Sequence, residues 1–176
     1  MSKTSFIASW FMAVVKAIGT RPVVAKGTDK TTRQTMLKPY NEALLKQTAV
    51  IDKSAYGEIE KKAKAHGYDS LVDFFIKNID SYKGKSYTST RKADDGTETK
   101  SEKLTAGVLN TELLPIFKTV FCPKANDATA GKMMMFLGIH LQQKKLIASK
   151  SAGIGRVCYM HPSGITGEID ATGLDD

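Results

Sequence analysis

Three features of this sequence predict a mainly α protein with minor β structure. Apolar residues recur every three or four positions through several long segments, which is the period of an amphipathic helix. Residues that cap helices precede these segments, and Gly follows several of them. Short runs rich in Thr, Val and Ile lie beside turn residues, as strands do. We therefore expect a helical core with a short strand-helix-helix unit, a polar β-arm and a C-terminal β-hairpin.

The chain has 176 residues, which is enough for one domain with a core of its own. Its composition, 41% hydrophobic and 25% charged, is ordinary for a globular protein. We expect a single domain over residues 1–176. Its segments are an amphipathic helix (1–19), a basic arm and short helix (20–46), a strand-helix-helix unit (47–84), a polar arm or loop (85–103), a helical pair (104–150), and a hairpin with an acidic tail (151–176).

The first helix is predicted over residues 6–18, where large apolar residues repeat at helical spacing. Thr4 or Ser5 can cap it, and Gly19 ends it. Its wide apolar face suits packing in the core, and it also suits binding to a partner or a second copy. Lys16 interrupts the apolar run, and no stretch of about 18 uncharged apolar residues exists, so we expect no membrane span.

The next elements are a basic loop or arm over residues 20–35 and a short helix from Pro39 to Leu45. Proline suits the first turn of a helix, because its missing N–H would have no partner there. Residues 47–51 contain Thr, Val and Ile, which favour an extended strand.

Two helices should follow this strand. Asp52 or Ser54 opens the first, since either side chain can accept a free N–H of the first turn. Gly67 ends it in the left-handed conformation that glycine adopts readily. Asp69 or Ser70 opens the second helix in the same way.

Residues 85–103 are almost wholly polar, and Asp95-Gly96 is a turn signal for a hairpin. We expect a projecting β-arm or a loop, in which Arg91 and Lys92 can touch an anionic partner. The remaining expected elements are a helix at 104–121, a helix that begins at Asp127 or Thr129, and a hairpin of strands 156–160 and 165–169.

The formal net charge of +8 favours an anionic partner, nucleic acid before an acidic membrane surface. Residues 1–50 hold eight basic and two acidic residues, whereas residues 151–176 hold one basic and four acidic residues. The expected phosphate contacts therefore lie in the N-terminal part, at Lys26, Lys30, Arg33 and Lys38. The acidic tail can dock on a basic surface of the same or a neighbouring copy, or it can remain a solvated end.

Patterns for catalysis or metal binding are missing. Cys158 and His161 have the spacing of half a zinc site, but no second half is present. Two cysteines far apart in sequence fit a reducing compartment, such as the cytoplasm or a virion. We expect no enzymatic activity, no metal and no cofactor.

Residues 47–82 combine a strand that ends in Asp, a helix with spaced apolar residues, and a Gly-aromatic-x-Ser turn that opens a second helix. The residues that carry this pattern are Ala49, Ile51, Asp52, Tyr56, Ile59, Ala63, Gly67, Tyr68, Asp69, Ser70, Asp73 and Phe74. The pattern resembles the ribbon-helix-helix family of DNA-binding proteins. The resemblance implies a dimer whose two strands pair and enter the major groove.

The same resemblance implies a set of DNA contacts. With alternate strand residues facing the core, Lys46, Thr48 and Val50 would face outward. Lys46 would bond guanine, Thr48 would bond several bases, and Val50 would meet a thymine methyl group. The free N–H groups near Ser70 and Leu71 would hold a phosphate.

An alternative starts from Phe74-Phe75-Ile76, an apolar block that indicates a helix buried in a larger helical domain. On that reading the chain is a viral or phage coat protein or nucleoprotein that assembles around its genome. A basic N-terminal half would face the nucleic acid, and extended elements would meet neighbouring copies. Both readings predict a basic protein that binds DNA or RNA and associates with itself.

Overall fold

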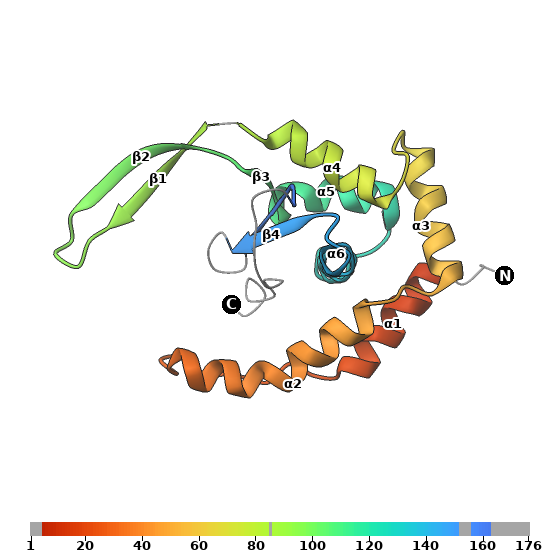
Figure 1. The fold of residues 1–176 in the computed structure, drawn as a ribbon, viewed down its shortest axis with the longest axis horizontal. Coiled ribbons are helices and arrows are strands. Elements are labelled where there is room, and N and C mark those ends of the chain that lie inside the picture. Colours follow the sequence, from red (N-terminus) through yellow and green to blue (C-terminus); the bar gives the residue numbers. More distant parts are fainter. Residues whose placement is uncertain (1–4, 85, 152–155, 163–176) are drawn as a thin grey trace.

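The protein is mainly helical with two small sheets, as the sequence predicts. The structure, a computed structural model, describes residues 5–84, 86–151 and 156–162 (Figure 1). Its helices are α1 (Phe6–Ile18), α2 (Lys30–Thr48), α3 (Lys53–Ala65), α4 (Leu71–Tyr82), α5 (Asn110–Phe121) and α6 (Asp127–Gln143). Its strands are β1 (Ser86–Lys92), β2 (Glu98–Leu104), β3 (Gly107–Leu109), β4 (Ala148–Ser151) and β5 (Val157–Met160).

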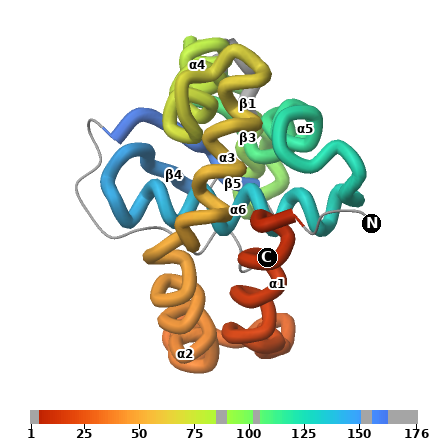
Figure 2. Tube along the Cα trace, turned by 90° about the vertical axis from the view of Figure 1, so that its right-hand side faces the viewer, coloured from red at the N-terminus to blue at the C-terminus, as the bar shows by residue number. Residues whose placement is uncertain are grey.

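Helix α6 lies at the centre of the molecule. Figures 1 and 2 show α4 and α5 on one side of it, α1 and α2 on the other, and α3 joining the two sides. Most of its residues from Met133 to Gln142 are buried, so this part of the helix is covered on nearly every face. Phe136 contacts the rings of both Trp10 and Phe11, at centroid distances of 6.4 and 5.4 Å. A helix surrounded in this way is a core element, not a surface helix.

Helix α1 forms where the sequence predicts it and packs in the chain's own core. The Ser5 side chain caps it, and Gly19 ends it with a φ of 72°. Its buried residues are Ile7, Trp10, Phe11, Val14 and Ile18. Of the two uses that its apolar face allows, the structure shows core packing.

The strand predicted over residues 47–51 is wrong. The helix predicted from Pro39 to Leu45 is present, but it is part of a longer helix that starts within the loop expected over residues 20–35. Asp29 caps a helix that begins at Lys30, runs through Pro39 and ends at Thr48. Leu44, on the inner face of this helix, is fully buried. The strand propensity of Thr and Val is weak and is overridden by tertiary packing, here the packing of α2 against α6.

Helices α3 and α4 agree with the prediction. Asp52 caps α3, Ser70 caps α4, and Gly67 between them has a φ of 85°. Phe74 and Phe75 of α4 are fully buried. Phe74 is the centre of an aromatic cluster whose other rings are Tyr68, Phe75, Phe117 and Phe121, at centroid distances of 5.0 to 6.1 Å.

The polar arm is a two-stranded antiparallel hairpin, β1–β2, that projects from the helical body (Figure 1). Its turn contains Gly96 with a φ of 88°, and the Ala93 N–H donates to the Thr97 carbonyl at 2.8 Å. Residues 90–101 are all exposed. The arm thus forms without a described apolar contact of its own.

The helix predicted over residues 104–121 begins later than expected. Residues 107–109 form β3, and α5 begins at Asn110, so Pro115 lies beyond the first turn. A Cβ at Gly107 would lie only 1.8 Å from the Tyr159 carbonyl oxygen, so the approach of β3 to β5 requires glycine.

Strand β5 pairs with other strands than the one that the predicted C-terminal hairpin gives it. β5 pairs with β4 and with β3 in a three-stranded sheet of order β3-β5-β4. The first predicted strand, 156–160, therefore corresponds to β5, but its described neighbours precede it in the sequence. The predicted strand at 165–169 lies outside the described residues.

Candidate nucleic-acid interface

Many of the described carboxylates accept hydrogen bonds from backbone N–H groups of the chain. Glu58 of α3 accepts from the Ser5 hydroxyl (2.9 Å) and the Ile7 N–H (2.7 Å) at the start of α1. Glu60, also in α3, accepts the Leu71 N–H at the start of α4 (3.2 Å). The others that accept a backbone N–H are Asp29, Asp52, Asp73, Asp95 and Glu112. At helix starts, the positive end of the helix dipole partly offsets these negative charges.

Unlike the carboxylates, most of the described basic side chains have no partner within the described part of the chain. Three lysines form ion pairs with carboxylates in the described part of the chain: Lys38 with Glu42 (3.9 Å), Lys77 with Asp73 (3.1 Å) and Lys118 with Asp127 (2.8 Å). A larger set is exposed, and its side chains form no hydrogen bond or ion pair with any described residue: Lys16, Lys26, Lys30, Lys46, Lys53, Lys61, Lys64, Lys83, Arg91, Lys92, Lys100, Lys124, Lys132, Lys144, Lys145, Lys150 and Arg156. We call this set the free cations.

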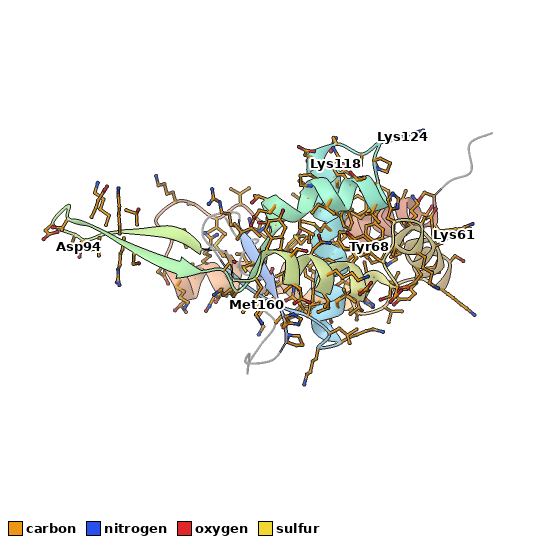
Figure 3. The ribbon with its side chains drawn as sticks, turned by 90° about the horizontal axis from the view of Figure 1, so that it is seen from above. Lys61, Tyr68, Asp94, Lys118, Lys124 and Met160 are labelled. Atoms are coloured by element: carbon orange, nitrogen blue, oxygen red, sulfur yellow. The ribbon has the colours of Figure 1, made fainter. Side chains whose placement is uncertain are left out.

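The free cations are spread over the molecule instead of forming one patch. In Figure 3, Lys61 lies at one end of the long axis, and Lys124 lies along one side near the paired Lys118. The tip of the arm, marked by Asp94, lies at the opposite end. Such a distribution suits contact with phosphates on several sides better than the reading of one short base sequence.

The residues predicted to contact phosphate lie in and just before α2. Lys26 is exposed in the loop ahead of the helix, and Lys30 is its exposed first residue. Arg33 is only half-exposed, and Lys38 lies 3.9 Å from Glu42 on the helix surface. The structure therefore places this predicted set on one helix and its entry loop, with Lys26, Lys30 and Lys38 exposed and Arg33 partly buried.

The three residues expected to read bases do not form a row. Thr48 is fully buried, and its hydroxyl donates to the Leu44 carbonyl at 2.7 Å. Lys46 is exposed in the last turn of α2, and Val50 is exposed just after it. Because residues 47–51 form no strand, the outward alternation that these contacts require is absent. The Thr48 side chain faces the interior, so in this structure it is not open to a base edge.

The end of α2 meets the end of α6 at Thr48. His140 Nδ1 lies 2.9 Å from the Thr48 carbonyl oxygen, and the Gln143 side-chain amide donates to the Thr48 hydroxyl at 3.0 Å. This junction carries Lys46 from α2, and Lys144 and Lys145 directly after α6. Cations near the C-terminal ends of both helices are favourable for the helix dipoles. No local sequence signal joins Lys46 to Lys144, because their elements are far apart in sequence.

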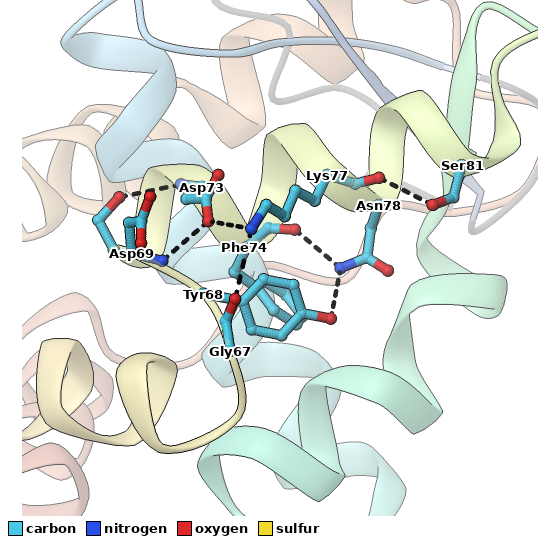
Figure 4. Close-up of polar contacts among 9 residues, drawn as sticks. Gly67, Tyr68, Asp69, Asp73, Phe74, Lys77, Asn78 and Ser81 are labelled. Atoms are coloured by element: carbon cyan, nitrogen blue, oxygen red, sulfur yellow. Dashed lines mark hydrogen bonds and ion pairs between the residues drawn. The ribbon is translucent and has the colours of Figure 1, made fainter.

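The turn between α3 and α4 uses its polar groups internally (Figure 4). The Ser70 hydroxyl accepts the Asp73 N–H at 3.0 Å, and the Asp73 carboxylate accepts the Asp69 N–H at 2.8 Å. Glu60 already holds the Leu71 N–H. Two carboxylates therefore occupy the place where a phosphate would have to approach Ser70 and Leu71. We leave Ser70 out of the interface for this reason.

A cavity of about 360 Å³ lies between α2, α5, α6 and β5. Its polar lining includes Arg21, Tyr40, Asn110 and Lys132, and none of the described residues that line it is a carboxylate. Burial raises the pKa of Tyr40, and the nearby Arg21 charge opposes that rise. The charge of this lining favours an anionic group over a cation.

The described residues offer little for nucleophilic or metal chemistry. Burial raises the pKa of the Cys122 and Cys158 thiols, which keeps both in the unreactive protonated form at neutral pH. Within residues 5–84, 86–151 and 156–162, no three His, Cys, Asp or Glu side chains are grouped to hold a metal ion. His161 instead contacts Asp80 at 2.6 Å.

Comparison with protein-family models, with curated proteins and with solved structures found no match. Among the described helices, none combines the length and the apolar character that crossing a membrane requires.

Proposed function

We propose that this chain is a non-enzymatic nucleic-acid-binding protein that contacts phosphates and associates with itself. One observation carries the proposal. Many described carboxylates are engaged at helix starts and turns of the chain, whereas the free cations face solvent without a partner among the described residues. An overall charge of +8 is therefore presented outward mainly by lysine. Such a surface attracts a polyanion and releases the counterions around it.

The proposed binding mode is contact with the nucleic-acid backbone. The free cations lie on several sides of the molecule, and no described strand presents Lys46, Thr48 and Val50 to a groove. Backbone contacts fix a protein on nucleic acid without reading its sequence. For this reason we do not carry forward the ribbon-helix-helix mode of reading DNA from residues 47–51.

Binding to random duplex DNA, single-stranded DNA and RNA tests the proposal. We expect binding to all three at low salt, with preference among duplex sequences well below the roughly 10³-fold that specific binders reach. Lys46→Gln, Lys144→Gln and Lys145→Gln together should weaken binding to every sequence alike. A strong preference for one duplex would contradict the backbone mode, and no binding at low salt would contradict the function.

The arm favours a second, related function, that of a coat protein or nucleoprotein that assembles around its genome. A two-stranded hairpin is marginally stable by itself in water, and residues 90–101 of this arm are all exposed. An arm of this kind gains stability when it meets another copy. Light scattering and electron microscopy, with and without nucleic acid, should then show large regular particles or filaments. A small, fixed oligomer under both conditions would exclude this second function.

A further inference from the structure

The outer edge of β2 has hydrogen-bonding groups that no described strand takes up. β2 pairs with β1 on one side only. The Ala93 N–H donates to the Thr97 carbonyl, so the pairs that exchange hydrogen bonds continue at Arg91–Thr99 and Ser89–Ser101. The alternate residues of β2 therefore direct their backbone N–H and C=O groups away from β1. These residues are Glu98, Lys100, Glu102 and Leu104.

We propose that this edge pairs with the same edge of a second copy, antiparallel and centred on Ser101. This inference rests on the self-association proposed above and names its surface. In the pairing, Lys100 lies opposite the partner's Glu102, and Glu102 lies opposite the partner's Lys100. Both residues have outward backbone groups, so each of these pairs can exchange two hydrogen bonds. Opposite charges directly across two strands stabilise their pairing.

The charge pattern of β2 selects this register over its neighbours. A pairing centred on Lys100 would place the two Lys100 residues opposite each other, and one centred on Glu102 would do the same with the two Glu102 residues. Like charges directly opposite each other destabilise both registers. Centring the pairing on Thr99 would leave the end of the strand near Leu104 unpaired. The register centred on Ser101 pairs all of Glu98–Leu104, and it sets no like charges opposite each other.

The product is a four-stranded sheet made of two arms. Three or more strands are generally needed for a sheet that is stable in water, and the pairing supplies them. A contact of this size is small compared with a standard protein interface, so the association depends on concentration. An exposed strand edge is the usual template for such pairing. The two copies are related by a twofold axis, so each contributes the same surface.

Charge reversal tests the pairing directly. Lys100→Glu alone and Glu102→Lys alone each place like charges opposite each other at both symmetric pairs. We expect each variant to self-associate at least about tenfold more weakly than the parent in sedimentation equilibrium. A one-to-one mixture of the two variants restores opposite charges at both pairs and should associate as the parent does. Lys124→Glu, the same charge change at an exposed lysine outside the arm, should have no such effect.

A cysteine placed on the twofold axis gives a second readout. Ser101→Cys brings two Cα atoms to about 4.5 Å in a pair without hydrogen bonds, which a disulfide can span. Thr99→Cys is the matched control, because its two copies would lie four residues apart along the strands, about 13 Å. Mild oxidation should cross-link Ser101→Cys and leave Thr99→Cys without a disulfide between copies.

The outcomes separate this surface from self-association in general. If the parent associates and the charge-reversed variants associate equally well, the β2 edge is overturned and self-association through another surface stands. Equal cross-linking of both cysteine variants also overturns it. If the parent stays monomeric at all concentrations, both the β2 pairing and the proposed self-association fail, while nucleic-acid binding is tested separately.

Discussion

The Nδ1 atom of His140 lies 2.9 Å from the carbonyl oxygen of Thr48, although α2 and α6 are separated by 3 other helices in the chain order. A carbonyl only accepts hydrogen bonds, so Nδ1 carries the proton and donates it. Burial lowers the pKa of His140; the bond to Thr48 opposes this effect, and the Lys144 charge adds to it. The imidazole is therefore neutral at neutral pH and fastens the end of α2 to the central helix.

The burial of His140 predicts a loss of stability in mild acid. The folded-state pKa of His140 lies below its ordinary value of 6.5, so the unfolded chain takes up the proton more readily. The protonation of His140 has no effect on the free energy of unfolding well above pH 6.5, and it lowers this free energy as the pH falls below 6.5. Urea unfolding should show the free energy of unfolding decreasing from about pH 7.5 to about pH 5.5. His140→Gln, which does not titrate, should show a smaller decrease, and an equal decrease in both proteins would contradict the assignment.

Thr48→Val tests whether this residue is structural or reads bases. The substitution removes a buried hydroxyl that donates to Leu44 and accepts from Gln143, at 2.7 and 3.0 Å. We expect a loss of about 1 kcal/mol in the free energy of unfolding, with nucleic-acid affinity unchanged. Denaturation and binding titrations on the same preparation measure both. A change in base preference at unchanged stability would favour the base-reading role.

Glu58→Ala should loosen α1. Glu58 accepts from the Ser5 hydroxyl and the Ile7 N–H, so its removal leaves the Ile7 N–H in the first turn of α1 without this acceptor. Hydrogen bonds to a charged group predict a loss of about 2 kcal/mol in the free energy of unfolding. Glu42→Ala is the control, because its ion pair with Lys38 spans 3.9 Å between exposed side chains and should contribute almost nothing. Equal effects of the two substitutions would contradict the capping role.

Phe74→Ala should be among the most destabilising single substitutions. Its ring is fully buried at the centre of the aromatic cluster between α4 and α5. The loss of the ring and the cavity that it leaves should lower the free energy of unfolding by about 3–5 kcal/mol. Phe6→Ala removes a ring that is 56% exposed and should cost far less. Thermal and urea unfolding compare the two, and a small effect at Phe74 would mean that the cluster collapses around the gap.

The sequence predicts elements whose signals are local. Helices α1, α3 and α4 have both an apolar period and a cap, at Ser5, Asp52 and Ser70, and each forms where expected. The Asp95-Gly96 turn likewise predicts the arm. These features depend on residues a few positions apart, so a single sequence contains the information.

The sequence-based predictions are wrong where contacts with residues far away in the sequence determine the structure. Residues 47–51 have strand propensity, but α2 continues through Thr48 because His140 and Gln143 hold it against α6. The pairing of β5 with β4 and β3 likewise depends on long-range contacts that no local pattern reveals. The phosphate site expected at Ser70 failed for a similar reason, since Glu60 reaches Leu71 from another helix.

The candidate interface is predictable from the sequence only in part. Net charge favours an anionic partner, and Lys26 and Lys30 are exposed, while their contact with phosphate stays a prediction. The contact between the end of α2, which carries Lys46, and the end of α6, which precedes Lys144 and Lys145, follows only from the fold. Whether a lysine is free or paired also requires it, because Lys118 is bound by Asp127 from another helix.

The salt dependence of binding tests the central claim most directly. Affinity for random duplex DNA would be measured by titration over a series of salt concentrations, for the parent and for the protein with Lys46→Gln, Lys144→Gln and Lys145→Gln. We predict that log affinity falls linearly with log salt, with a slope of about −0.9 for each phosphate contacted. The triple substitution should make this slope shallower by about 0.9 for each replaced lysine that neutralises a phosphate. An affinity that does not change with salt, or the absence of binding at low salt, would contradict the account.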